Sequence, residues 1–305
     1  MSAQSFVADH VLALLPSVQR ARRLGAVLPV RSRKHLSVPF LHAGELVATA
    51  DPATRKLSGF ALEYECARGG LDHDAVLAQM QRILAIVRAG VQQGLAGTEY
   101  HDRILPRQSH RFAEMLERGA LLDGGILNRA ILYVTALMEV KSSMGVIVAA
   151  PTAGSCATFP ATTLAAAEAQ GCTDDVIVRA MLAAGLIGVF VATRSSFAAE
   201  VGGCQAETGA GAAMAAAALV ELAGGNAAQG LSAASHALQN VLGLVCDPIA
   251  ARVEAPCLGR DAHRQISENM ARELRCTALG GLSISPTSKA IEARLCGNGG
   301  CAHCG

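Results

Sequence analysis

The sequence predicts an all-α protein, an Ala- and Gly-rich helical domain, on three grounds. Hydrophobic residues make up 51% of the 305 residues and charged residues 17%, so the chain can bury a sizeable core. Aromatic residues contribute only 3% and Trp is absent, so small and aliphatic side chains must fill that core, which suits closely packed helices. Strand signals are scarce, and the sequence contains no strand–GxGxxG–helix unit.

Helical periodicity accounts for most of the chain beyond Leu57. The clearest run covers 75–95, where apolar residues recur at helical spacing after Asp74, the expected N-cap. Asp174 is a good start signal for a helix that reaches residue 193. Further helices are expected over 109–121, 127–144, 160–170, 208–222, 227–242 and 261–274.

Three segments are expected: a poorly patterned N-terminal segment (1–55), a helical catalytic domain (56–295) and a Cys/Gly-rich tail (296–305). The net charge of +1 gives no reason to expect a nucleic acid or an acidic membrane as partner. The chain start lacks the basic region of an export signal. The apolar stretch between Arg179 and Arg194 is shorter than the roughly 18–20 residues that span a membrane, so it predicts a buried core helix. We therefore expect a cytoplasmic protein.

Ten cysteines in such a chain favour a metal site or catalysis over disulfides. Three of them sit in distinctive surroundings close to Gly or Pro: Cys204 in Gly-Gly-Cys-Gln, Cys246 in Cys-Asp-Pro and Cys257 in Ala-Pro-Cys. Each should lie on a loop or at a helix end, where thiolates can converge on one metal and backbone N–H groups stabilise their charge. The spacing by itself leaves open whether they bind a metal or are small buried residues.

Several segments occur in the order found in a known family. They are Leu137-Met138-Glu139-Val140, Ser143-Met144-Gly145, the Ala-Pro-Thr-Ala-Gly-Ser loop, Gly-Cys-Gln with its following Glu, His236-Ala237-Leu238, Leu-Gly-Leu-Val-Cys-Asp-Pro, Pro256-Cys257 and Gly280-Gly281-Leu282. Together they resemble the α subunit of the iron–sulfur-dependent L-serine dehydratases, from about residue 60 to 291. The sequence departs from the usual pattern at Lys141-Ser142 and Arg260-Asp261, which puts the substrate in more doubt than the metal centre.

The resemblance implies that loops converge on a [4Fe–4S] cluster held by Cys204, Cys246 and Cys257. Three cysteines leave one iron open, whereas four would suit electron transfer. An open iron is a Lewis acid that helps hydroxide to leave, since a catalytic metal can lower the pKa of bound water to about 7. The implied reaction eliminates water from L-serine and ends in pyruvate and ammonia, a step of amino-acid catabolism that can feed gluconeogenesis.

Four further residues are candidates for substrate binding or catalysis. Thr152 and Ser155 lie on the loop 145–155, where a glycine lets the backbone approach a ligand, although a structural turn is the alternative. His236 is the first candidate for the base that takes the Cα proton; the alternative is a structural histidine. Lys141 either binds a carboxylate or is solvated.

The resemblance also implies a partner chain. Single-chain members of the family carry an additional N-terminal domain with a Ser-Ser-Ser-His-Thr element, which is absent here, so a separate β subunit is expected. Two other functions stay open: a cluster-dependent lyase for another β-substituted amino acid, such as a cysteine desulfidase, and a non-catalytic helical metal-binding scaffold. A pyridoxal-phosphate enzyme is disfavoured because none of the four lysines lies in the context of a cofactor anchor.

The tail holds three of the ten cysteines in a glycine-rich stretch that cannot form a stable helix. We expect a flap whose Cys304 binds the open iron when substrate is absent. A separate metal site that uses Cys296, Cys301, His303 and Cys304, or a tail without a ligand role, are the alternatives.

Overall fold

A computed structural model describes residues 37–242, except 102 and 104. Within this part of the chain every regular element is an α-helix, so the predicted all-α fold class is confirmed. The helices are α2 (Ala43–Thr49), α3 (Leu57–Gly69), α4 (His73–Ala96), α5 (Ser109–Glu117), α6 (Ile126–Ser142), α7 (Thr158–Ala169), α8 (Asp174–Arg194), α9 (Ala199–Gly202), α10 (Cys204–Leu222) and α11 (Ala227–Gln239).

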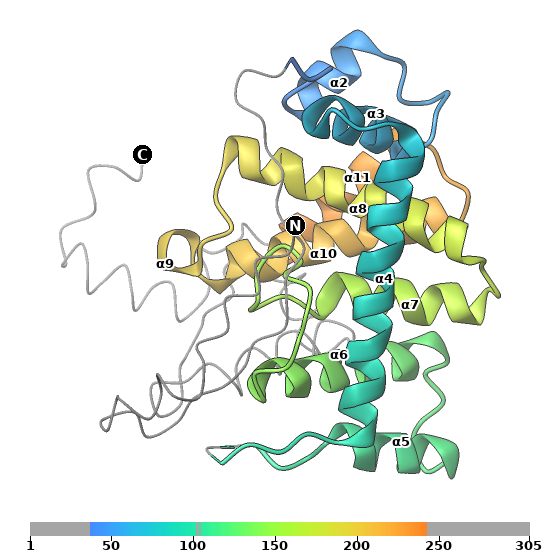
Figure 1. The fold of residues 1–305 in the computed structure, drawn as a ribbon, viewed down its shortest axis with the longest axis vertical. Coiled ribbons are helices and arrows are strands. Elements are labelled where there is room, and N and C mark those ends of the chain that lie inside the picture. Colours follow the sequence, from blue (N-terminus) through green and yellow to red (C-terminus); the bar gives the residue numbers. More distant parts are fainter. Residues whose placement is uncertain (1–36, 102, 104, 243–305) are drawn as a thin grey trace, which may run out of the picture. The chain divides into compact units, whose positions relative to one another are not determined.

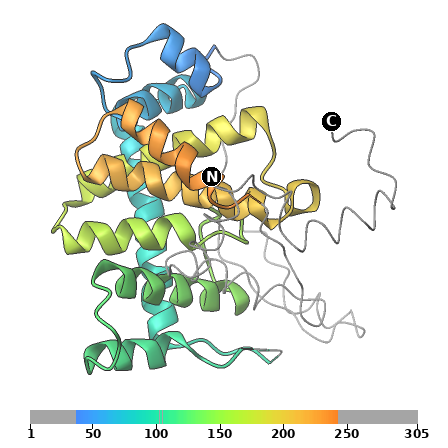
Figure 2. The same cartoon turned by 180° about the vertical axis from the view of Figure 1, so that it is seen from behind.

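The helix α10 lies at the centre of the packing. It contacts α7, α8 and α11, while α6 packs between α7 and α4. Figures 1 and 2 show α6, α7 and α10 stacked one above the other, with the long helix α4 running across the stack. This arrangement brings the segment between α6 and α7 beside the N-terminal end of α10.

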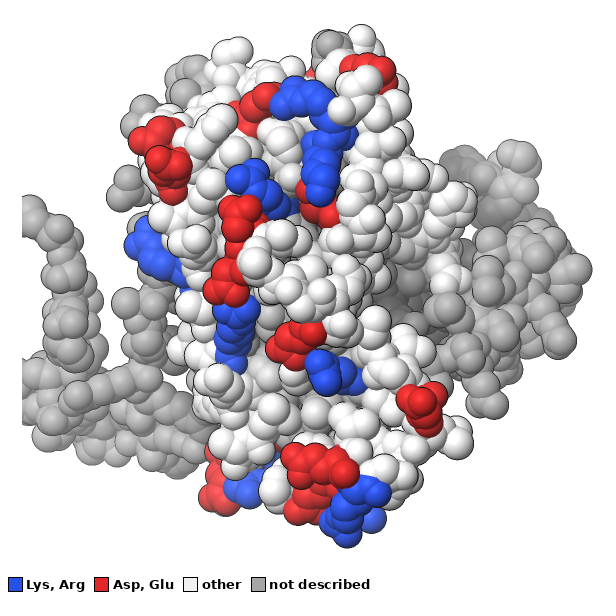
Figure 3. Space-filling view, turned by 90° about the vertical axis from the view of Figure 1, so that its right-hand side faces the viewer, with Lys and Arg blue, Asp and Glu red and all other residues white. Residues whose placement is uncertain are grey.

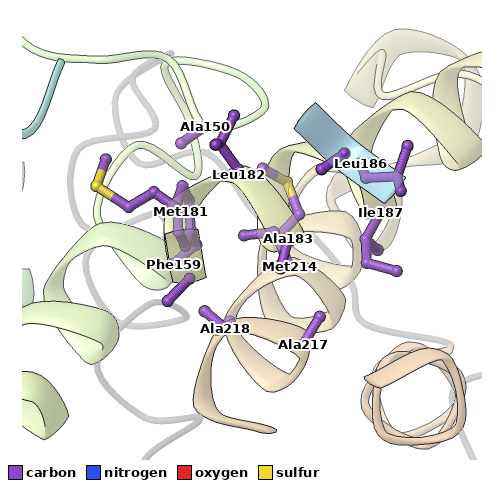
Figure 4. Close-up of a cluster of buried hydrophobic side chains, with 14 of the residues drawn as sticks. Ala150, Phe159, Met181, Leu182, Ala183, Leu186, Ile187, Met214, Ala217 and Ala218 are labelled. Carbon is purple, nitrogen blue, oxygen red and sulfur yellow. The ribbon is translucent and has the colours of Figure 1, made fainter. Parts of the chain in front are cut away.

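Small and aliphatic side chains fill the core, as the composition predicts. Buried alanines are frequent on α7, α8 and α10, and they allow these helices to approach one another closely. Figure 4 shows part of this core, in which Leu182 and Ala183 of α8 lie close to Met214 of α10. Such packing fixes the helices as a rigid frame for the loops that they carry.

The helix α8 is the apolar helix that the sequence predicts in the core. Its 21 residues make it longer than the apolar stretch between Arg179 and Arg194, and by length and composition it could cross a membrane. Its most apolar 18-residue window is 61% buried inside the protein, where it packs against α3, α7 and α10. The burial accounts for its hydrophobicity as a core helix.

Several predicted helix ends are shifted in the structure. The N-cap of α4 is Asp72, whose side chain accepts from Ala75 N at 2.7 Å; Asp74 lies in the first turn instead. The start of α10 is Cys204, four residues before the predicted start. The expected ends at 121, 144 and 242 fall at 117, 142 and 239. The helix expected over 261–274 lies outside the described residues.

Two buried carboxylates hold the N-termini of other helices. Glu139 of α6 accepts from Gln108 N at 2.6 Å, Ser109 N at 3.2 Å and Ser109 Oγ at 2.8 Å, at the start of α5. Glu221 of α10 accepts from Ser58 N at 3.2 Å and Ser58 Oγ at 2.6 Å, in the first turn of α3. Each carboxylate satisfies orphan donors of a helix start and locks two helices together.

Gly94 of α4 lies directly against the backbone of α6. A Cβ built on this residue would lie 2.4 Å from the carbonyl oxygen of Ala136 and 2.6 Å from its Cα. The two backbones therefore touch directly, and α4 and α6 can pack this closely only because residue 94 has no side chain.

Charges of both signs alternate over the face drawn in Figure 3. Ion pairs on the surface join separate helices: Arg88 and Asp174 form two hydrogen bonds of 2.7 and 2.8 Å, and Arg129 lies 3.5 Å from Glu168. The hydrogen bond with Arg88 lowers the pKa of Asp174. Because these pairs are solvent-exposed, each adds little to stability.

Candidate active site

A glycine, Gly203, determines the N-terminal end of α10. Gly203, the N-cap, has φ +70°, a conformation that favours glycine, and it turns the chain from α9 into α10. Cys204 is the first residue of α10 and is 5% exposed. Its thiol therefore lies at the positive end of the α10 dipole, where backbone N–H groups can stabilise a negative charge.

The loop between α6 and α7 meets α10 within one turn of Cys204. The Thr152 hydroxyl donates to Glu207 Oε1 at 2.8 Å, across 55 positions of sequence. Glu207 lies in the first turn of α10, three residues after Cys204. Residues three apart on a helix share a face, so the thiol and the carboxylate are neighbours. The structure thus joins the predicted substrate loop to the predicted ligand Cys204.

The loop carries a short chain of hydrogen bonds. Ser155 Oγ lies 3.3 Å from Thr152 Oγ1 and donates to Ala150 O at 3.4 Å. Ser155 is completely buried, so it supports the shape of the loop and the position of Thr152. A Cβ on Gly211 of α10 would lie 3.3 Å from Ser155 Cβ, so a small residue at 211 permits this close approach.

Gly154 has a more specific role than a turn. A Cβ on this residue would lie 2.5 Å from Glu207 Oε2 and 2.9 Å from both Oε1 and Cδ. The carboxylate therefore rests against the backbone of the loop. Any larger residue at 154 must displace Glu207 and disturb its hydrogen bond with Thr152.

Lys141 and His236 lie on two other helices, α6 and α11. Lys141 is in the last turn of α6, partly buried, and forms no ion pair with a described residue. His236 is exposed on α11, with Nδ1 2.8 Å from Ser232 O. Because a carbonyl oxygen only accepts, Nδ1 carries the proton and Nε2 of the neutral ring is left as an acceptor. Neither side chain bonds to Thr152, Ser155 or Glu207, and their roles stay predictions.

The remaining predicted ligands, Cys246, Cys257 and Cys304, lie outside the described residues. Within the described part, no group of three or more His, Cys, Asp or Glu side chains is placed to hold a metal ion. Two of the three predicted cluster ligands fall beyond residue 242, so the cluster also stays a prediction.

Glu207 is the functional candidate that the sequence reasoning did not single out. It appears there only as the Glu that follows Gly-Cys-Gln. A signal was available, because a helix that starts at Cys204 places residue 207 on the same face. The predicted start at residue 208 left both Cys204 and Glu207 outside the helix, so their shared face was not recognised.

A separate pocket of about 460 Å³ opens between α8, α10 and α11. Its wall includes Gln205 and Ala206, the two residues after Cys204, but most of its lining is apolar. Arg194 and three serines are its polar exceptions besides Gln205. An apolar wall suits a zwitterionic amino acid poorly, so the Thr152–Glu207 pair is the better candidate site.

Comparison with known proteins connects these features to one family. The family model "Serine dehydratase alpha chain" matches residues 53–267. A "Probable L-serine dehydratase, alpha chain" of Bacillus subtilis is 34% identical over 251 residues, which cover 73% of this chain and 84% of the relative. An "L-serine dehydratase, alpha chain" of Peptoniphilus asaccharolyticus is 35% identical over 82% of this chain and 86% of its own length.

A longer relative, "L-serine dehydratase TdcG" of Escherichia coli, is 35% identical over 84% of this chain but only 58% of its own length. The matched region contains the loop 145–155, the start of α10 and the three predicted cluster cysteines. This chain belongs to the serine dehydratase alpha chain family.

Proposed function

We propose that this chain is the catalytic α subunit of an L-serine dehydratase, which eliminates water from L-serine and yields pyruvate and ammonia. The observation that carries the proposal is the hydrogen bond between Thr152 and Glu207. It places a polar loop of the matched family region beside Cys204, the first predicted cluster ligand. Relatives that are named L-serine dehydratases share this region.

Cys204 fits the requirements of a cluster ligand. Its thiol is buried at the start of a 19-residue helix, where backbone N–H groups stabilise negative charge. With Cys246 and Cys257 it would hold a [4Fe–4S] cluster by three thiolates. Such a cluster, when bound, supplies an open iron that acts as a Lewis acid toward the β-hydroxyl group of serine.

The protein's own residues then have to bind the amino acid and move a proton. Thr152 and Glu207 offer oxygen atoms beside Cys204, and Ser155 keeps Thr152 in place. His236 is the candidate in this chain for the base that takes the Cα proton, through Nε2. Lys141 is the candidate partner for the substrate carboxylate.

A β subunit is part of the proposal. Relatives from Bacillus subtilis and Peptoniphilus asaccharolyticus are named alpha chains, and the Escherichia coli relative extends well beyond the matched region. We propose that a separate β chain completes the active site here too. An oxygen-sensitive cluster also favours the reducing cytoplasm as the compartment.

The proposal is tested by anaerobic purification of this chain with its partner chain. About four irons and four sulfides for each α chain are expected, together with pyruvate formation from L-serine. Stoichiometric zinc without iron would instead support the structural scaffold, and a full iron content without serine turnover would refute the proposed substrate. The Cys204→Ala and His236→Gln variants separate the roles: the first should lose iron, whereas the second should keep iron and lose turnover.

Cysteine is the main competing substrate, because its β-thiol is also eliminated from an amino acid. Comparing kcat/KM for L-serine and L-cysteine in the same preparation decides between the two. Hydrogen sulfide release that is faster than pyruvate formation from serine would assign the chain to the desulfidases.

A further inference from the structure

We infer that Glu207 and Thr152 form the subsite for the ammonium group of the amino-acid substrate. The inference deepens the proposed function and rests on it. The pair would recognise a primary ammonium group next to a carboxylate, in preference to a neutral hydroxyl at the same carbon.

The hydrogen bonds of the Thr152 hydroxyl have a fixed direction. A carboxylate only accepts, so the single proton of the Thr152 hydroxyl is committed to Glu207 Oε1. The Ser155 hydroxyl, the other neighbour, can then only donate toward Thr152 or toward Ala150 O. Thr152 is therefore left to present lone pairs, and it can bind an incoming group only as an acceptor.

The other carboxylate oxygen of Glu207, Oε2, is available to a ligand. Glu207 Oε2 accepts no hydrogen bond from any side chain or backbone group in the described part of the chain. A Cβ built on Gly154 would lie 2.5 Å from this oxygen, so the loop backbone comes close to it and carries no side chain that covers it. The pair therefore offers a negative, acceptor-only surface made of Glu207 Oε2 and the Thr152 oxygen.

The ammonium group is the part of serine that fits this acceptor-only surface. Serine carries one group with donors only, its ammonium, which has three N–H bonds and a positive charge. The carboxylate of serine would be repelled by Glu207, and its β-hydroxyl has to reach the metal centre at which it leaves. Both Glu207 and Thr152 are partly exposed, so a small ligand can reach them. Charge-assisted hydrogen bonds of this kind are about twice as strong as neutral ones.

The distance between Cys204 and Glu207 along α10 suits a ligand of the size of serine. Glu207 lies one turn from Cys204, or about 4.5 Å along the helix axis. Serine places its nitrogen two bonds from the carbon that carries the hydroxyl. A serine held at Glu207 by its ammonium group is small enough for its hydroxyl to reach the turn that begins with Cys204.

The test compares two ligands that differ only in the recognised group. L-Alanine carries the ammonium and L-lactate carries a hydroxyl in its place. Binding of each to the complete enzyme, this chain with its partner and metal centre, is measured by calorimetry under anaerobic conditions. The wild type should bind L-alanine more tightly than L-lactate, and Glu207→Gln should reduce this preference at least tenfold.

A matched control is available on α7. Glu168 also accepts a hydrogen bond from a hydroxyl, that of Tyr133 at 2.6 Å, but it lies near the opposite end of α7 from the loop. Glu168→Gln should leave the preference unchanged. Thr152→Ser should keep it, because the hydroxyl remains, whereas Thr152→Val should weaken L-alanine binding and raise the KM for serine more than it lowers kcat.

Two results would overturn the inference: a wild type that does not favour L-alanine over L-lactate, or a Glu207→Gln enzyme in which both ligands weaken in parallel. Parallel weakening would mean that Glu207 only supports the fold of the loop. The proposed function is tested separately, by serine turnover. The preference for L-alanine over L-lactate is measured by binding and does not depend on turnover.

Discussion

Replacing Gly94 with Ala tests the direct backbone contact between α4 and α6. The new Cβ would lie 2.4 to 2.6 Å from three backbone atoms of Ala136, whereas carbon atoms in contact are normally about 3.5–4.0 Å apart. The helices must therefore separate by about 1 Å, and no side chain can rotate away to relieve the clash. Overpacking of this kind costs about 1–3 kcal/mol, and a backbone clash belongs at the upper end.

The helix preference of Ala offsets part of this cost. Replacing Gly with Ala inside a helix stabilises by about 1 kcal/mol when the side chain is accommodated. We therefore expect Gly94→Ala to lower the free energy of unfolding by about 2 kcal/mol. Gly185→Ala in α8 is the matched control, because its Cβ meets nothing within 4 Å. That variant should be up to about 1 kcal/mol more stable than the wild type.

Urea unfolding of both variants, followed by far-UV circular dichroism, measures the difference of about 3 kcal/mol between them. Equal stabilities of the two variants would refute the close contact between α4 and α6.

Three further predictions concern single side chains. Glu139→Ala removes the acceptor of the Gln108 and Ser109 backbone N–H groups, while the Ser109 hydroxyl keeps Gly94 O as an acceptor, so it should lower the free energy of unfolding by about 2–4 kcal/mol, and hydrogen exchange should show α5 opening first. Burial and the hydrogen bond to a carboxylate raise the pKa of Tyr133 to about 12, so stability should fall between pH 10 and 12, where only the unfolded chain has lost this proton. Tyr133→Phe should flatten that part of the stability curve and remove the late-titrating phenol from the ultraviolet spectrum. Cys204→Ala should abolish iron content and turnover together, and a variant with full iron would exclude Cys204 as a ligand.

Local signals predicted the helices well where they were strong. Asp174 begins α8 as expected, since Thr173 at the N-cap position and two acidic residues in the first turn precede a long apolar run. Asp72 and Asp74 both carry N-cap chemistry, and only the tertiary structure shows that Asp72 makes the bond to the backbone. The short helices α2 and α9 have too few residues to produce a periodic pattern.

The candidate site was predicted in part. Family motifs identify Cys204 and the loop with Thr152 and Ser155, but neither composition nor periodicity brings the loop to α10. That meeting depends on contacts across 55 residues, on the missing side chain of Gly154 and on the packing of Gly211. Sequence patterns report neighbours within a few residues, so the partner of Thr152 had to come from the fold.

The helix α10 carries one carboxylate at each end, and this fixes its length. Glu207 holds the loop through Thr152, and Glu221 holds the start of α3 through Ser58. The two carboxylates are 14 residues apart, close to four turns of 3.6 residues, so they project from nearly the same side. Inserting or deleting a single residue between them would rotate one end by about 100° relative to the other and shift it by about 1.5 Å. Homologous chains should therefore differ in length before or after α10, and a length change inside this helix should uncouple the active-site loop from the rest of the protein.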